Sequence, residues 1–502
     1  MLTVLAFPHE GAYSFLSWAC MVPWLVSLKG AGRLERAFAG LLYGISFSVP
    51  GQWGGIWSAI ENKDWPFTLS CILLALFFIC YIIPFVVFSF AHPRIAGKNK
   101  QSVFIQSAFL TCIISWFPTY FPVTPACMIH DQLLFVQLAD VGGLGAVVFI
   151  VCFVNISIAE IILQFKNKTL FVFHLFCFNV FVLFVSLYGY YRLVEFDQQK
   201  TSGEGTAIEI IAVQTRIRPA ETLKSLIRQN SRDTFSALEW SAHAIEKHPN
   251  ADLIVFPEAS VDTTILNRKQ ELIKSLSEFA MQQDKPILFN VLDEISSATP
   301  ARFHNSVQMM KSNGTLGAKY AKNILTPFYE YNPLQEWLSI GDFKLEPGEE
   351  PGVFPFENAH LIPAVCYEIH SARHIRDGVH AGGDLIIHTA NFYTFGKGTI
   401  GYIDFAMAKL RAVENRVPIA RSCNWGYGAF IDATGAVIPG SFNPPTKRNA
   451  LCFPVFIPNQ RAPYTYIGDL FLYILTIITV VGLVGYSPIR RLCFYWIGRD
   501  IV

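Results

Sequence analysis

Three polar residues lie next to short apolar runs or in a conspicuous loop motif. Glu258 follows the run DLIVF, Cys366 directly follows LIPAV, and Lys322 lies in the segment YAKNILTPFYEY (320–331). A thiol is mostly protonated at neutral pH, because its unperturbed pKa is about 8.5. A nearby carboxylate can take its proton, while a nearby ammonium favours the thiolate and stabilises the oxyanion of a tetrahedral intermediate. Together these residue types favour catalysis by a thiol nucleophile.

Taken singly, each residue has a more ordinary role. A glutamate after a strand often caps the next segment, a loop lysine is usually solvated, and a cysteine that ends a core strand is more often inert packing. Their order along the chain does not show that they are close. No Gly-x-Ser-x-Gly, Walker, His-Glu-x-x-His or Cys-x-x-Cys motif occurs. His370 and His374 could share a helix face but have no evident third ligand, so we expect no metal site and no cofactor.

The elements that must position these residues alternate between strands and helices. Buried strands are predicted at 207–213, 252–256, 286–292, 361–365 and 384–388, and helices at 221–247, 266–283 and 401–416. Ser312–Thr315 (SNGT) predicts a hairpin turn, and the Pro-, Gly- and Glu-rich stretch 341–358 predicts a loop. Apolar runs alternating with helices indicate a layered α/β domain with catalytic groups at strand ends.

The chain as a whole is too apolar for an ordinary soluble enzyme. Of its 502 residues, 52% are hydrophobic and 15% are charged. The net charge of +1 excludes nucleic-acid binding driven by a large positive field. Only 16 of the first 191 residues are charged, against 56 of the 272 residues in 192–463. We therefore predict a membrane domain at 1–191, an exported soluble domain at 192–463, and a C-terminal membrane helix with a tail at 464–502.

Seven apolar segments are candidate membrane spans. They are 11–28, 37–60, 67–90, 103–122, 133–163, 169–191 and 466–486. Basic residues follow every second span, at Lys29, Arg33 and Arg36, at Arg94, Lys98 and Lys100, at Lys166 and Lys168, and at Arg490, Arg491 and Arg499. Because cytoplasmic loops are rich in Lys and Arg, this pattern places residues 192–465 outside the cytoplasm. The opening MLTVLAFP lacks a positive n-region, so we expect no cleaved signal peptide.

Few ionisable residues fall inside the predicted spans. Asp140 and Glu160 are the main ones, and both lie close to span ends or to glycine. The predicted exported domain has three cysteines, Cys366, Cys423 and Cys452. Three cannot all pair with one another, so at least one thiol stays free or pairs outside the domain.

The motifs together resemble the Glu-Lys-Cys signature of the nitrilase, or carbon–nitrogen hydrolase, superfamily. FPEAS, YAKNILTPFYEY and VCYE occur in that order, and the string K-x-x-L-x-P-F-x-E-Y-x-P is close to the form seen in bacterial apolipoprotein N-acyltransferases. The opening LAFPHEGAYSFLSW and the segment RAVENRVPIARSCNWGYGAFIDATG are also similar to that family. The resemblance covers nearly the whole chain and implies a multi-span α-helical membrane domain joined to an αββα nitrilase-like domain.

The resemblance also implies a role for each residue of the signature. Glu258 would be the general base, Lys322 the oxyanion stabiliser and Cys366 the nucleophile, with Glu330 and Glu368 as further active-site acids. The implied reaction moves an acyl chain from a phospholipid, through a cysteine thioester, to the N-terminal amine of a diacylglyceryl-cysteine apolipoprotein. This is the last step of lipoprotein maturation. The implied location is the bacterial inner membrane, with the catalytic domain facing the periplasm.

Several segments depart from the family pattern. Val213–Arg216 replaces a Val-Gln-Gly-Asn-like start, Thr389–Gly396 replaces an Asn-Asp…Trp-Phe-Gly loop, and Ile403-Asp404 stands where a Gln-His pair is expected. The chain also begins partway through what would be the family's first membrane helix. Two other functions stay open, a membrane-anchored amide or nitrile hydrolase and a catalytically silent membrane scaffold or transport protein. Against the hydrolase, seven spans are far more than an anchor requires.

Overall fold

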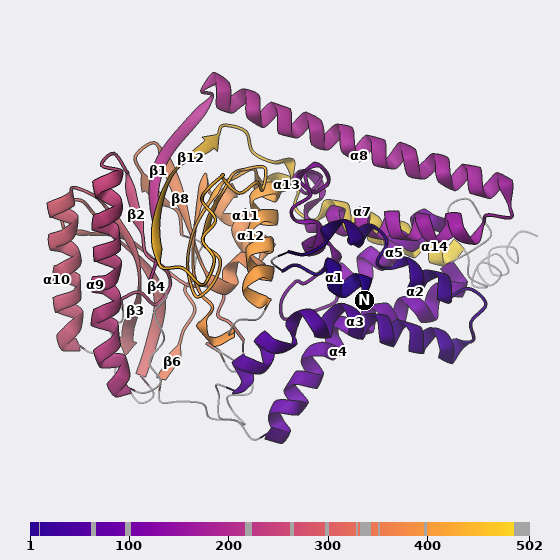
Figure 1. Ribbon diagram of the computed structural model, residues 1–502, viewed down its shortest axis with the longest axis horizontal. Coiled ribbons are helices and arrows are strands. Elements are labelled where there is room, and N and C mark those ends of the chain that lie inside the picture. Colours follow the sequence, from indigo (N-terminus) through magenta and orange to yellow (C-terminus); the bar gives the residue numbers. More distant parts are fainter. Residues whose placement is uncertain are drawn as a thin grey trace, which may run out of the picture. The chain divides into compact units, whose positions relative to one another are not determined.

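The computed structural model divides the chain into two compact units. One comprises Met1–Leu193, Lys397–Ala406 and Ile467–Val502, and the other Val194–Gly396 and Met407–Tyr466. The structure describes residues 1–9, 11–61, 67–95, 102–215, 223–261, 266–296, 301–327, 330–331, 343–349, 352–395 and 399–485. Figure 1 shows the helices and strands of both units.

The first unit is helical. Its longer helices are α3 (Arg33–Glu61), α4 (Phe67–Ile95), α5 (Ser102–Trp116), α7 (Ala139–Leu163), α8 (Lys168–Ser202) and α14 (Leu470–Gly485). Its short elements are α1 (Leu2–Ala6), η1 (Ser14–Trp18), α2 (Val22–Ser27), η2 (Pro125–Ile129) and α6 (Leu133–Val136). Within the described residues, Phe67–His92, Ala139–Leu163 and Lys168–Ser202 are long and apolar enough to cross a membrane.

Some predicted spans differ from the helices observed. The segment predicted as one span at 11–28 contains two short elements, η1 and α2. Helix α5 ends at Trp116, shortly before Pro118, where proline disfavours helical backbone in the preceding residue. The segment 133–163 is divided between α6 and α7. Helix α8 continues without a break past Tyr191, the end of the predicted span.

The second unit contains two β-sheets. The first has the strand order β12-β1-β2-β3-β4-β5, with β6 beside β4, and the second has the order β11-β10-β9-β8-β7. The strands of the first are β1 (Gly205–Gln214), β2 (Leu253–Val255), β3 (Ile287–Ser296), β4 (Ala301–Met310), β5 (Leu316–Ala321), β6 (Phe343–Leu345) and β12 (Asn449–Pro458). Those of the second are β7 (Phe354–Phe356), β8 (Ala359–Val365), β9 (Leu385–Asn391), β10 (Ile419–Asn424) and β11 (Ala429–Ile431).

The two sheets pack face to face. Successive side chains of a strand point to opposite faces, and β1 is apolar on both. Ile210 lies in the core between the sheets together with Leu361 and Ile387 of the second sheet. Ile211, the next residue, packs in a second core with Leu276. That second core includes side chains from α9 (Leu223–Lys247) and α10 (Leu266–Gln283), which therefore cover the outer face of the first sheet.

Helices α11 (Ala372–His380) and α12 (Ile400–Asn415) lie on the other side of the sheets from α9 and α10 (Figure 1). Helix α11 approaches β8 closely, since a Cβ added at Gly378 would lie 2.8 Å from Cγ2 of Ile362. The resulting helix–sheet–sheet–helix layering confirms the αββα domain. The prediction of a loop over 341–358 is wrong in part, because β6 and β7 lie within it. Strands of three residues are too short to show a periodic pattern.

Candidate active site

The three residues of the signature lie at or just beyond strand ends. Glu258 follows β2, Lys322 directly follows β5, and Cys366 directly follows β8. Two of these turns hold a non-glycine residue at positive φ, +51° at Cys366 and +58° at Ala259. Such a conformation is uncommon outside glycine and persists only where the surroundings impose it. The side chain of Asn290 contributes by accepting a hydrogen bond from the Ala259 N–H at 2.8 Å.

A buried cluster of charges surrounds Lys322. Its Nζ lies 2.6 Å from Oε2 of Glu330 and 3.7 Å from Oε1 of Glu258. The side-chain amide of Asn305 donates to both carboxylates, at 3.0 Å in each case. Lys322 has no solvent-exposed surface, and Glu258 is also buried. The structure therefore brings together one ammonium and two carboxylates away from bulk water, where their mutual attraction is strong.

Burial and mutual attraction shift the pKa values of this cluster in opposite directions. Burial raises the pKa of Glu258, the Lys322 charge opposes that rise, and repulsion from Glu330 adds to it. Burial alone would lower the pKa of Lys322, but attraction to Glu330 and Glu258 outweighs burial and leaves it raised. Burial likewise opposes ionisation of Glu330, yet Lys322 outweighs it and leaves the pKa of Glu330 lowered. Lys322 is thus held charged beside a carboxylate that protonates readily.

Cys366 adjoins this cluster. Its side chain hydrogen-bonds the Glu258 carboxylate and interacts electrostatically with Lys322. Cys366 is partly exposed. A carboxylate with a raised pKa can take the thiol proton and later return it, and a fixed ammonium can stabilise an oxyanion. The arrangement has the groups needed for acyl transfer through a thioester.

Glu368 hydrogen-bonds the backbone of two segments, the one that follows Lys322 and the one that precedes Cys366. One oxygen accepts from the backbone N–H of Asn323 at 2.6 Å and of Ile324 at 3.2 Å, just after Lys322. The other oxygen accepts from the N–H of Val365 at 2.8 Å, just before Cys366. Glu368 is fully buried, so these bonds fix the loop after β5 against the end of β8.

Tyr320 and His374 complete the surroundings of Glu368. The Tyr320 hydroxyl donates to Glu368 at 2.5 Å and lies 3.1 Å from Nε2 of His374. His374, in α11, therefore pairs with a tyrosine and a carboxylate.

A second supporting chain lies behind Cys366. Nε2 of His388, on β9, is 3.2 Å from the backbone carbonyl oxygen of Cys366. Nδ1 of the same ring is 2.6 Å from Nη1 of Arg421, on the adjacent strand β10. Arg421 is fully buried and also donates from Nε to the carbonyl of Tyr427 at 2.6 Å. These contacts hold the backbone turn that carries the thiol.

Sequence reasoning missed four of these supporting residues, Asn290, Asn305, His388 and Arg421. Asn290 is a single polar residue inside the apolar run PILFNVL, and a buried polar side chain in a core strand requires a hydrogen-bond partner. That signal could have identified Asn290. Asn305 lies on β4, of which sequence reasoning predicted only the part next to the hairpin turn at Ser312–Thr315. Arg421 lies on β10, which was not among the predicted strands.

The segments that depart from the family pattern fall in three elements. Residues 213 and 214 end β1, Asn391 ends β9, and Ile403 and Asp404 belong to α12. Arg216 and Gly396 are outside the described residues, as are the basic positions Lys98, Lys100 and 490–499.

Two family models match the chain. The model for the N-terminal domain of apolipoprotein N-acyltransferase matches residues 1–157, and the model for carbon–nitrogen hydrolase matches residues 218–448. Together they account for most of the chain, including both the helical unit and the αββα unit. The first model and the three long apolar helices identify a membrane protein.

Apolipoprotein N-acyltransferases of other bacteria are similar to this chain over most of their length. The apolipoprotein N-acyltransferase of Borreliella burgdorferi is 23% identical over 96% of this chain and 93% of its own. That of Rhizobium leguminosarum bv. trifolii is 25% identical over 87% of this chain and 85% of its own. Among solved structures, an amidase from Nesterenkonia sp. matches 54% of this chain and 96% of its own, with 16% identity and a TM-score of 0.41. On the matches to both family models and to these full-length relatives, the chain belongs to the apolipoprotein N-acyltransferase family.

Proposed function

We propose that this protein transfers an acyl chain from a phospholipid, through a thioester on Cys366, to the N-terminal amine of a diacylglyceryl-cysteine apolipoprotein. The observation that carries the proposal is the buried Lys322 ammonium between Glu330 and Glu258, with the Cys366 thiol bonded to Glu258. Full-length similarity to apolipoprotein N-acyltransferases supplies the substrate class.

In the first half-reaction, Glu258 takes the proton from the Cys366 thiol, and the thiolate attacks an ester carbonyl carbon of the phospholipid. The new C–S bond turns the carbonyl oxygen into an oxyanion, which Lys322 stabilises. Collapse of this intermediate breaks the ester C–O bond. The leaving lysophospholipid oxygen receives the proton held by Glu258, whose raised pKa suits both accepting and returning it.

In the second half-reaction, the uncharged α-amine of the apolipoprotein attacks the thioester carbonyl. Glu258 takes a proton from the attacking nitrogen while Lys322 again stabilises the oxyanion. Collapse breaks the C–S bond and forms an amide, and the Cys366 sulfur recovers its proton from Glu258. Glu330 keeps Lys322 charged and in place through both steps, because its carboxylate lies 2.6 Å from the ammonium.

Both proposed substrates carry acyl chains buried in the bilayer. Moving such a chain fully into water costs about 0.8 kcal/mol for each CH2 group, so an enzyme in the membrane avoids a large penalty. We place the catalytic domain, residues 192–463, on the periplasmic side of the inner membrane. Lys29, Lys166 and Lys168 support this orientation, because they lie in connections that would then be cytoplasmic. Alkaline phosphatase fused after residue 463 should be active, and an inactive fusion would contradict the orientation.

The experiment for the overall reaction uses purified full-length protein, a phospholipid and a synthetic diacylglyceryl-cysteine peptide. Mass spectrometry should show the peptide gaining one acyl group and the phospholipid losing it. Cys366→Ala should abolish the transfer, whereas Cys71→Ser, at an exposed cysteine of the helical unit, should leave it unchanged. Release of free fatty acid with an unmodified peptide would contradict the proposal and indicate a hydrolase.

A further inference from the structure

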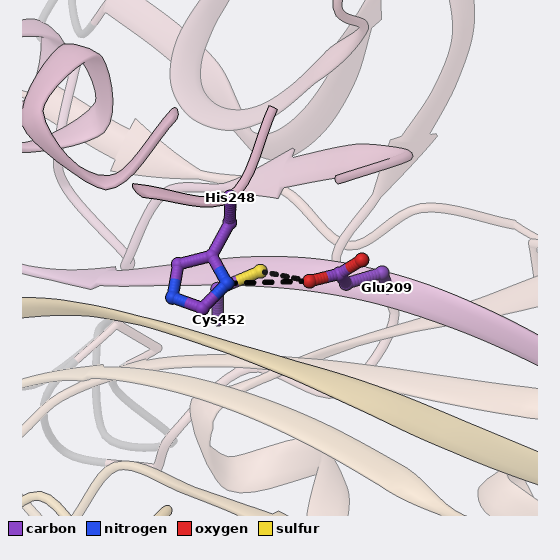
Figure 2. A group of neighbouring side chains, drawn as sticks. All are labelled: Glu209, His248 and Cys452. Atoms are coloured by element: carbon purple, nitrogen blue, oxygen red, sulfur yellow. Dashed lines mark hydrogen bonds and ion pairs between the residues drawn. The ribbon is translucent and has the colours of Figure 1, made fainter. Parts of the chain in front are cut away.

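A second cluster of ligand-type side chains lies on the αββα unit, away from Cys366. It consists of Glu209 on β1, Cys452 on β12 and His248 directly after α9. Their ligand atoms all lie within 4.8 Å of one another. Figure 2 shows the carboxylate, the imidazole and the sulfur converging from three elements on one point.

Strand register explains why two of these residues meet. Strands β1 and β12 are antiparallel, with Ile211 opposite Cys452 and Glu209 opposite Pro454. Glu209 and Cys452 are therefore diagonal neighbours on one face of the sheet, close enough for long side chains to touch. Oε1 of Glu209 lies 3.3 Å from the Cys452 sulfur.

The backbone also holds the third residue in place. The N–H of His248 donates to the carbonyl oxygens of Ala244 and Ile245 at the end of α9, and its own carbonyl accepts from Ala251. Asp252 connects this turn to β1, because its carboxylate accepts a hydrogen bond from the N–H of Glu209 at 2.7 Å. Nδ1 of the imidazole lies 3.4 Å from Oε1 of Glu209.

We propose that Glu209, His248 and Cys452 bind a divalent transition metal ion of the Zn²⁺ type, with water as the fourth ligand. Bond lengths of about 2.0–2.3 Å place neighbouring ligand atoms of a tetrahedral zinc ion about 3.3–3.6 Å apart. The separations of Oε1 of Glu209 from the Cys452 sulfur and from Nδ1 of His248, 3.3 Å and 3.4 Å, fit this spacing. Sulfur, imidazole nitrogen and carboxylate oxygen are the three donor types that zinc accepts.

Charge and access support the same conclusion. The Glu209 and His248 side chains are 30% and 43% exposed, which leaves room for an ion and a water to enter from solvent, while Cys452 is buried beneath them. Without a metal, the Cys452 thiol donates its proton to a hydrogen bond with Oε1 of Glu209 at 3.3 Å. Metal binding would displace that proton to bulk water. One thiolate and one carboxylate then balance the two positive charges of the ion.

A metal here would act as a structural clamp. It would join β12, at the edge of the first sheet, and its neighbour β1 to the turn that follows α9. The proposal does not depend on the acyl-transfer reaction, since none of the three residues contacts the Lys322 cluster among the described interactions. The spacing of residues in the sequence did not indicate this site, because more than 200 residues separate His248 from Cys452.

The test is a cobalt and zinc titration of purified full-length protein that has been stripped with a chelator. We expect one equivalent of Co²⁺ to bind with a sulfur-to-cobalt charge-transfer band, and Zn²⁺ to displace it. Cys452→Ser should abolish the band, and His248→Gln should weaken binding at least about 100-fold, since even loss of an outer-shell contact costs 10–100-fold. Bound Zn²⁺ should also protect Cys452 from alkylation.

Matched controls separate this site from adventitious binding. His243→Gln removes an exposed histidine of α9 that pairs with Glu246, and Cys71→Ser removes an exposed cysteine. Both variants should keep the cobalt band. Zn²⁺ should also raise the melting temperature of the wild type and of both controls, but not that of Cys452→Ser. No cobalt–sulfur band in the wild type, or an unchanged band in folded Cys452→Ser, would overturn the proposal.

Discussion

Arg421 lies 2.6 Å from Nδ1 of His388, and this contact determines the tautomer of the histidine. A guanidinium can only donate hydrogen bonds, so Nδ1 must accept and the ring proton must reside on Nε2. Nε2 then donates to the carbonyl oxygen of Cys366, 3.2 Å away. A buried arginine thereby supports the strained turn at the proposed nucleophile through a neutral histidine.

This relationship predicts that Arg421 positions the nucleophile without touching substrate. Arg421→Met should lower the single-turnover rate of Cys366 acylation about 10-fold, equivalent to about 1.4 kcal/mol of barrier, because the thiol is held less accurately. The KM for phospholipid should change less than about twofold. The measurement is rapid-quench mass spectrometry of the acylated protein.

The control for this prediction is Arg373→Met. Its side chain is 83% exposed and pairs with Asp377 at 3.5 Å on the helix surface, so its removal should leave acylation unchanged. Equal acylation rates in Arg421→Met and the wild type would show that the Arg421–His388 contact has no positioning role.

Glu330 is predicted to control the pH dependence through Glu258. Glu258 must be ionised to take the thiol proton, and burial and Glu330 raise its pKa, so activity should fall with decreasing pH in a window above that of an ordinary glutamate. Glu330→Gln removes the repulsion and should move this acidic limb to lower pH. It should also lower kcat about 10- to 100-fold, since Lys322 loses its partner at 2.6 Å.

The measurement is kcat/KM as a function of pH for the wild type and Glu330→Gln. A limb that stays in place, or moves to higher pH, would contradict the assigned coupling between Glu330 and Glu258.

Glu368 is predicted to stabilise the fold of the site rather than react. Glu368→Gln puts an amide group where the carboxylate now accepts from backbone N–H groups of Asn323 and Val365, which leaves buried donors unsatisfied. We expect a loss of about 2–3 kcal/mol of unfolding free energy and a melting temperature lower by about 5–10 °C. Glu278→Gln, at a 60% exposed side chain of α10, should change it little. A melting temperature for Glu368→Gln equal to that of this control would contradict the role.

Asp140 is predicted to stabilise the helical unit and not to carry ions. Its carboxylate is fully buried, accepts a hydrogen bond from Tyr188 at 2.6 Å and forms an ion pair with Arg192 at 2.7 Å. Asp140→Asn leaves Arg192 without its counter-charge and should cost about 3 kcal/mol, seen as a shorter half-life of activity on heating in detergent. Asp131→Asn, at a 49% exposed side chain, should be close to wild type. Ion flux in liposomes that Asp140→Asn abolishes would instead support a transport function.

Much of the αββα unit could be predicted from local pattern. Runs such as AIEIIAV and DLIVF are apolar on both strand faces, and β1 and β2 are buried on both sides as expected. The strand-end positions of Glu258 and Cys366 followed from the runs DLIVF and LIPAV. Their proximity to Lys322 came only from the family resemblance.

The supporting residues could not be predicted, because their contacts depend on register between strands. His388 lies opposite Arg421 only because β9 and β10 pair in one particular register, which residue types alone do not specify. Glu209 and Cys452 meet for the same reason across β1 and β12. In the helical unit, hydropathy located apolar segments but did not show that 11–28 is divided into η1 and α2.

Cys366 is the proposed carrier of the acyl chain, and intact mass spectrometry can detect an acyl group bound to it. Full-length protein incubated with phospholipid alone should gain the mass of one acyl group, and hydroxylamine should remove it, because thioesters are cleaved by hydroxylamine. The adduct should be absent from Cys366→Ala and retained in Cys71→Ser. An acyl adduct that persists in Cys366→Ala, or no adduct on folded wild-type protein, would contradict the account.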